Sequence, residues 1–155
     1  MGDTRVVVER RIAAPVGQVW EALTDLESAP QVLSGVERVE VLTSGPFAVG
    51  TRWRETRRMF GREATEEMYV TAAEQPEHIV VEADSRGAHY VSEFTLSPEP
   101  EDTTAVRMAF SATEPGGFAG LLTKLFGKLG ARAVVKAMEK DLADIAAAVE
   151  RPAAS

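Results

Sequence analysis

The last third of the chain, residues 117–150, most constrains the fold, because it is a long helical pattern with two separate apolar stripes. In its second half apolar residues recur at steps of four and three, the spacing of one buried helix face, at Ala131, Val135, Met138, Leu142, Ile145 and Val149. The first half has its own stripe, which points about half a turn away and consists of Phe118, Leu121, Leu122, Leu125 and Leu129. Because glycine weakens a helix interior, Gly127 and Gly130 predict a break between the stripes. We expect a C-terminal core helix, preceded by a segment that covers something else.

Short β-type segments separated by turn residues fill the rest of the chain. Strands are predicted at Thr4–Ile12, Val36–Thr43, Thr51–Phe60, Ala64–Ala73, Glu77–Ala83, His89–Ser97 and Thr104–Thr113. After the first strand, Pro15 opens a helix with Trp20 as its anchor, and residues 26–33 form a second short helix or turn. The short links between strands predict antiparallel neighbours. Such a sheet must bury one face, and only the C-terminal helix is long enough to cover it.

Composition and charge exclude several classes of protein. A length of 155 residues with 45% hydrophobic residues fits one domain over 1–150, followed by a frayed tail at 151–155. The absence of cysteine excludes disulfides and thiolate chemistry, and a formal net charge of −7 argues against nucleic-acid binding. No apolar run near the start is long enough for a signal peptide or membrane span, so a cytoplasmic protein is expected.

The first helical stripe coincides with a basic region. Residues 115–138 contain no acidic residue, and four cations lie there: Lys124, Lys128, Arg132 and Lys136. Our main interpretation is a lid that closes a cavity with its apolar side and turns its lysines to water. The same features also suit transient contact of residues 117–136 with an anionic membrane. The two interpretations are compatible if the lid opens at the glycines.

The hairpin over residues 51–73 contains the candidate polar site. A two-residue turn at Gly61–Arg62 would pair Trp53 with Val70, Glu55 with Met68, Arg57 with Glu66 and Met59 with Ala64. All these residues would then face inward, although a three-residue turn would exchange the faces of one strand. Buried charge requires a partner, so Arg57 is expected to pair with Glu66 or Glu55. Arg57 either orients a ligand carboxylate, phenolate or carbonyl, or belongs to a structural cross-strand pair.

Residues at other inward-facing strand positions are predicted to complete the wall of a pocket. Tyr90 and Ser92 alternate with outward residues along one strand, and Met108 and Phe110 lie on the next. Methionine would make such a wall adaptable. His78 and His89 fall in the outward frames and are expected at the surface, and with no cysteine a zinc site is not expected. No nucleophile elbow, phosphate loop or dinucleotide fingerprint occurs, so neither a metal nor a cofactor is expected.

Three stretches resemble the polyketide cyclase/dehydrase and lipid-transport family, which belongs to the START-like, Bet v 1-like superfamily. They are residues 12–25 (IAAPVGQVWEALTD), residues 49–53 (VGTRW) and the final helix over 142–150. The resemblance implies an α+β helix-grip fold, in which a seven-stranded antiparallel sheet wraps around the C-terminal helix and leaves a cavity between them. It does not imply one reaction, because members include binding proteins, transfer proteins and cyclases.

Three functions follow as hypotheses. The favoured one is a carrier that binds a hydrophobic small molecule such as a lipid, isoprenoid or polyketide. The alternatives are a cyclase, aromatase or dehydratase, with Arg57, Tyr90 and Glu55 as catalytic candidates, and a co-chaperone-like interaction module. The predicted ligand-binding residues are Trp53, Glu55, Arg57, Met59, Glu66, Met68, Tyr90, Ser92, Met108, Phe110, Phe118, Leu122, Leu125 and Met138. The chain is expected to act as a monomer or homodimer.

Overall fold

The structure, a computed structural model, describes residues 5–59, 61–85, 88–113 and 130–150. Residues 117–129 of the predicted lid, including Phe118, Leu122 and Leu125, therefore lie outside the described residues, whereas residues 130–136 belong to the helix α4. The elements are β1 (Arg5–Ile12), α1 (Val16–Thr24), the 3₁₀ helix η1 (Leu26–Ser28), α2 (Ala29–Val32), β2 (Val36–Val41), β3 (Arg52–Met59), β4 (Arg62–Glu74), β5 (His78–Ser85), β6 (Ala88–Glu99), β7 (Thr103–Thr113) and α4 (Gly130–Val149). Most element ends lie within two residues of the predicted ones.

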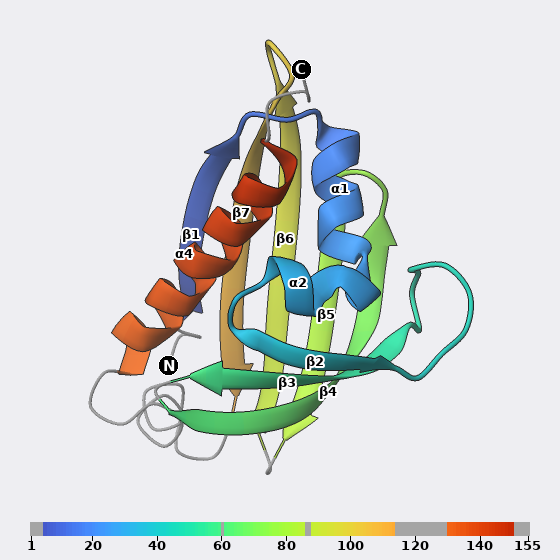
Figure 1. Ribbon diagram of the computed structural model, residues 1–155, viewed down its shortest axis with the longest axis vertical. Helices are drawn as coiled ribbons and strands as arrows, with labels where there is room; N and C mark the ends of the chain where they lie inside the picture. The colour runs from blue at the N-terminus through green and yellow to red at the C-terminus, as the bar shows by residue number, and fades with distance from the viewer. Residues whose placement is uncertain (1–4, 60, 86–87, 114–129, 151–155) are drawn as a thin grey trace.

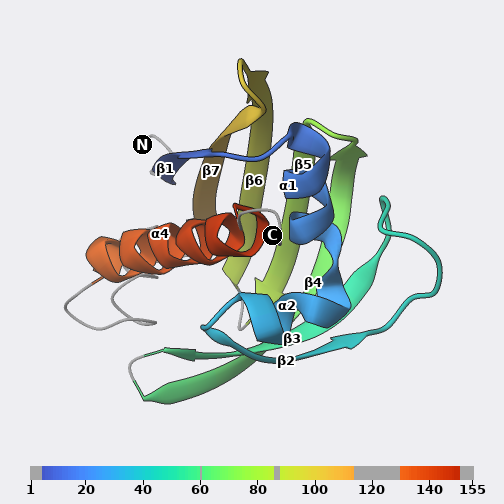
Figure 2. The same ribbon diagram turned by 45° about the horizontal axis from the view of Figure 1, so that its top comes forward.

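The strands form one seven-stranded sheet in the order β1-β7-β6-β5-β4-β3-β2, and all neighbours pair antiparallel. The helix α4 lies across one face of this sheet, with α1 and α2 beside it on the same face (Figure 1). A view turned by 45° shows how strongly the sheet curves around α4 (Figure 2). This arrangement is the helix-grip fold, so the predicted fold class is confirmed.

The C-terminal stripe supplies much of the core. Met138, Leu142 and Ile145 are buried as predicted, and Leu142 is only 1% exposed. They pack in one cluster with sheet residues that include Leu96 and Val106. The buried face of α4 also includes Ala133, Val134 and Ala146, whereas Val135 and Val149 are half-buried. Burial of this face fixes α4 against the inner surface of the sheet.

Three aromatic residues connect α1 to β3. Trp20, the predicted anchor of α1, is buried, and its ring centroid lies 6.4 Å from that of Phe47 in an edge-to-face arrangement. Phe47 comes from the loop after β2, and its ring centroid lies 6.3 Å from that of Trp53. Aromatic pairs at such separations add to the stabilisation from burial. These contacts hold the loop after β2 against α1 and β3.

The predicted register of the β3–β4 hairpin is wrong by two residues. Trp53 pairs with Met68, Glu55 with Glu66, Arg57 with Ala64 and Met59 with Arg62. The connection therefore lies one residue earlier than Gly61–Arg62. Because side chains alternate with a period of two, a shift by two residues changes the partners but preserves the faces. The inward direction of Trp53, Glu55 and Arg57 consequently agrees with the prediction.

Both histidines lie in the outward frames of their strands, and each ring contacts two carboxylates. The ring nitrogens of His78 lie 2.8 Å from Glu74 Oε1 and 2.7 Å from Glu93 Oε2. Those of His89 lie 2.6 Å from Asp84 Oδ1 and 2.7 Å from Glu82 Oε1. The outer face of the β4–β5–β6 region thus carries two histidine–carboxylate clusters.

These clusters predict a loss of stability as the pH rises. The pKa of each histidine is raised above its ordinary value of 6.5, and the largest cause is a hydrogen bond to a carboxylate. The partner is Glu93 for His78 and Asp84 for His89. A histidine whose pKa is raised by folding stabilises the folded protein fully at pH values below its unfolded-state pKa. This stabilisation is lost as the pH rises through the folded-state pKa. We expect the free energy of unfolding in urea to fall as the pH rises above the ordinary histidine pKa of 6.5. The double variant His78→Gln, His89→Gln should flatten that decline, and an unchanged slope would contradict the assignment.

Candidate functional site

A pocket lies between the inner face of the sheet and the helices α1, α2 and α4. Its cavity volume is about 120 Å³. The sheet side and the loop after β2 contribute Phe47, Trp53, Glu55, Arg57, Met68, Ile79, Val81, Ser92, Phe94 and Met108. The helix side contributes Ala22, Leu23, Asp25, Leu26, Ala29, Val32, Leu33, Asp141, Leu142 and Ile145. The wall is mainly apolar, and its polar groups are few.

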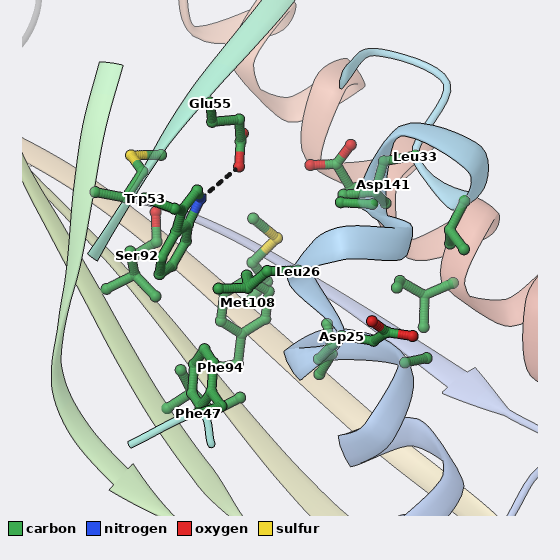
Figure 3. A pocket seen from close by; sticks show the side chains of 18 of the residues that line it. Asp25, Leu26, Leu33, Phe47, Trp53, Glu55, Ser92, Phe94, Met108 and Asp141 are labelled. Carbon is green, nitrogen blue, oxygen red and sulfur yellow. Dashed lines mark hydrogen bonds between the residues drawn. The ribbon is translucent and has the colours of Figure 1, made fainter. Parts of the chain in front are cut away.

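A connected polar cluster of Trp53, Glu55, Arg57 and Asp141 forms one part of the wall. Arg57 donates from Nε to Glu55 Oε2 at 2.6 Å, and from Nη1 and Nη2 to the two Asp141 oxygens at 3.2 and 2.8 Å. Trp53 donates from Nε1 to Glu55 Oε1 at 3.2 Å, as drawn in Figure 3. The Arg57, Glu55 and Asp141 side chains are only 26%, 11% and 14% exposed. We call these four residues the polar cluster.

Local periodicity explains how the polar cluster assembles. Trp53, Glu55 and Arg57 occupy alternate positions of β3, so their side chains share its inner face. Asp141 lies three residues after Met138 and four before Ile145, so it belongs to the buried face of α4. Packing of α4 against the sheet then brings a carboxylate onto the arginine fork, and the bidentate pair ties the helix to β3.

Burial and ion pairing have opposite effects on the pKa of Arg57 and on that of Asp141. Burial alone would lower the pKa of Arg57, but Asp141 and Glu55 raise it above its ordinary value, so the guanidinium stays charged. Burial raises the pKa of Asp141, and the attraction of Arg57 opposes this shift. The cluster therefore combines a permanent cation with a buried carboxyl that takes up a proton more readily than it would in water.

The predicted site residues fall into three groups. Those at the pocket wall are Trp53, Glu55, Arg57, Met68, Ser92 and Met108. Those placed elsewhere are Glu66, opposite Glu55 on β4; Tyr90 and Phe110, stacked with centroids 6.0 Å apart; and Met138, in the core. Phe118, Leu122, Leu125 and the side chain of Met59 lie outside the described residues. The structure therefore brings Glu55 and Arg57 together at the pocket without Tyr90, and the assignment of all these residues to ligand binding stays a prediction.

Asp141 is the main pocket residue that sequence reasoning missed. The expected partners of Arg57 were Glu66 and Glu55, and the structure shows Glu55 and Asp141 instead. The available signal was a carboxylate at the spacing of the buried stripe of α4, between Met138 and Ile145. An acidic residue on an otherwise apolar helix face requires a cation from the opposing surface, and Arg57 is that cation.

Comparison with protein families supplies an assignment. Residues 3–150 match the model of the family described as polyketide cyclase / dehydrase and lipid transport. The chain belongs to this family. The resemblance in residues 12–25, 49–53 and 142–150 is thereby confirmed. A comparison with curated protein sequences gave no significant match.

Solved structures agree with the fold of this polyketide cyclase/dehydrase family member. The Zhui aromatase/cyclase from a Streptomyces species is 18% identical, with a TM-score of 0.78 over 97% of this chain and 95% of that one. A START superfamily protein from Mycobacterium smegmatis is 14% identical, with a TM-score of 0.75 over 94% and 97% of the two chains. A protein from Thermus thermophilus is 26% identical, with a TM-score of 0.69 over 94% and 99%.

Two further observations concern metal-binding residues and membrane-spanning helices. In the described ranges, no group of three or more histidine, cysteine, aspartate or glutamate residues is arranged to hold a metal ion. None of the helices in the described part of the chain is long and apolar enough to cross a membrane.

Proposed function

We propose that this protein binds a hydrophobic small molecule in the pocket between the sheet and α4. The observation that carries the proposal is the composition of the wall, in which fifteen of twenty lining residues are apolar. Ligand pockets characteristically combine such a wall with a few orienting polar groups. Lipid transport in the family description, and the START superfamily neighbour, support a ligand-binding role.

The size of the cavity bears on the ligand. Apolar cavities of roughly 150 Å³ admit one benzene-sized ring, and the volume here is about 120 Å³. The cavity is of the same order, so a single ring fills it in this conformation, and a ring with a short chain requires small movements of the flexible methionine side chains in the wall. Larger lipid, isoprenoid or polyketide-like molecules would require Met68, Met108 or Phe47 to move, and methionine side chains adapt readily. We regard carriage of such an apolar molecule as the function.

A cyclase, aromatase or dehydratase is the second candidate, and the polar cluster is what favours it. A buried carboxyl whose pKa is raised by burial suits proton transfer, and a fixed cation beside it can stabilise a developing enolate. The name of the Zhui aromatase/cyclase shows that the same fold accompanies this class of protein. Turnover would require the ligand to reach Arg57, Glu55 or Asp141 directly.

Native mass spectrometry of the purified protein, followed by solvent extraction, tests the binding proposal. We expect an apolar compound that is lost on denaturation. Ser92 faces the pocket, so Ser92→Leu should fill the cavity and abolish copurification, while Val91→Leu on the opposite face of the same strand should leave it unchanged. Thermal unfolding verifies that both variants fold. Equal retention of the compound in folded Ser92→Leu would contradict binding in this pocket.

A further inference from the structure

The geometry points to a ligand whose polar group is cationic or a neutral hydrogen-bond donor, such as an amine, alcohol or phenol, rather than a carboxylate. This inference rests on the proposed function, because it concerns the same pocket. It replaces the simpler expectation that the arginine receives an anionic ligand, and it follows from how the polar cluster is already paired.

Arg57 is committed to protein carboxylates. A guanidinium offers five N–H donors, and three of them donate to Glu55 and Asp141 in a fork geometry. An incoming carboxylate could adopt the same bidentate geometry only by displacing Asp141. Displacement would leave Asp141 as a buried carboxylate without its cation, a state that is strongly unfavourable.

The net charge of the pocket wall also disfavours an anionic ligand. In the described part of the pocket the charged lining residues are Asp25, Glu55, Arg57 and Asp141, three formal negative charges against one positive charge. A ligand anion would therefore enter a site whose wall already carries excess formal negative charge. An ammonium group would be attracted by the same excess.

The carboxylates also supply the acceptors that a donor group needs. An ionised carboxylate has about four acceptor positions, and Glu55 uses one on each oxygen for Trp53 and Arg57. Figure 3 shows Glu55 and Asp141 contributed to the same part of the pocket by β3 and α4. A hydroxyl or ammonium beside them completes hydrogen bonds without breaking the ion pair.

Four probes with one carbon skeleton test this inference: propylbenzene, 3-phenylpropanol, 3-phenylpropylamine and 3-phenylpropanoate. Binding is followed by calorimetry and by Trp emission near neutral pH and low salt, since Trp53 lines the pocket. We expect the amine to bind at least about tenfold more tightly than the carboxylate, with the alcohol between them. Equal affinities, or a preference for the carboxylate, would overturn the inference while propylbenzene binding still supported the proposed function. Failure of all four probes, propylbenzene included, would overturn both.

A matched pair of variants on α4 locates the preference. Asp141→Asn removes one negative charge from the polar cluster and should reduce the amine-to-carboxylate ratio by about tenfold. Glu139→Gln removes the same charge from an exposed position of the same helix and should leave the ratio unchanged. If Asp141→Asn fails to fold, Glu55→Gln removes the neighbouring charge. An unchanged ratio in a folded variant of the polar cluster would contradict the assignment.

Discussion

Replacement of Arg57 by alanine is expected to destabilise the protein by roughly 3–5 kcal/mol. The substitution leaves Glu55 and Asp141 as largely buried carboxylates without their cation, and uncompensated buried charge is among the most destabilising defects. Urea denaturation near neutral pH measures the loss. Arg54→Ala is the matched control, because Arg54 is 51% exposed and pairs with an exposed Glu40. Its ion pair contributes at most about 1 kcal/mol.

The cost of the Arg57 substitution should depend on pH. Burial raises the pKa of Asp141, and removal of the arginine would raise it further. A carboxyl whose pKa is raised in the folded state favours folding at low pH, and this contribution is lost as the pH rises through the folded-state value. The destabilisation should therefore be smaller near pH 4 than near pH 7. A loss below about 1 kcal/mol for Arg57→Ala, or one independent of pH, would contradict the buried ion-pair account.

Replacement of Leu142 by alanine should remove roughly 2–5 kcal/mol of stability. Leu142 is 1% exposed in the centre of the buried face of α4, so truncation removes apolar contacts and leaves a cavity. Leu42→Ala provides a leucine control, because Leu42 is 37% exposed beyond the end of β2 and should lose well under about 1 kcal/mol. Similar losses for the two leucines in chemical denaturation would contradict the placement of α4 in the core.

Local sequence patterns predicted the strands and the C-terminal core helix, and the family resemblance supplied the helix-grip arrangement. The period of Met138, Leu142 and Ile145 predicted the helix face, and turn residues separated the strands. The exact turn of the β3–β4 hairpin was not predictable, because neighbouring dipeptides around Gly61 are comparable turn candidates and side-chain packing selects the register. The resulting error of two residues preserved the faces, so the inward direction of Glu55 and Arg57 was still obtained.

The polar cluster was only partly predictable because its ion pair connects distant segments. Glu55 and Arg57 are two residues apart on one strand, and a shared face follows from strand geometry alone. Asp141 is 84 residues away from Arg57 on another element, and its contact depends on how α4 docks against the sheet. The cavity likewise follows from the curvature of the sheet and the position of α1 and α2, which hydrophobic periodicity does not specify.

The most direct test of ligand binding is a titration of isotope-labelled protein with propylbenzene, followed through backbone amide chemical shifts. If the pocket is the binding site, saturable shift changes should concentrate around pocket residues of β3, β6 and α4, including Trp53, Ser92 and Leu142. Amides of the turn between β6 and β7, at Glu101 and Asp102, contribute no lining residue to the pocket and should be little affected. Absence of saturable changes, or changes centred on the outer face of the sheet, would contradict the proposal that this pocket binds a hydrophobic small molecule.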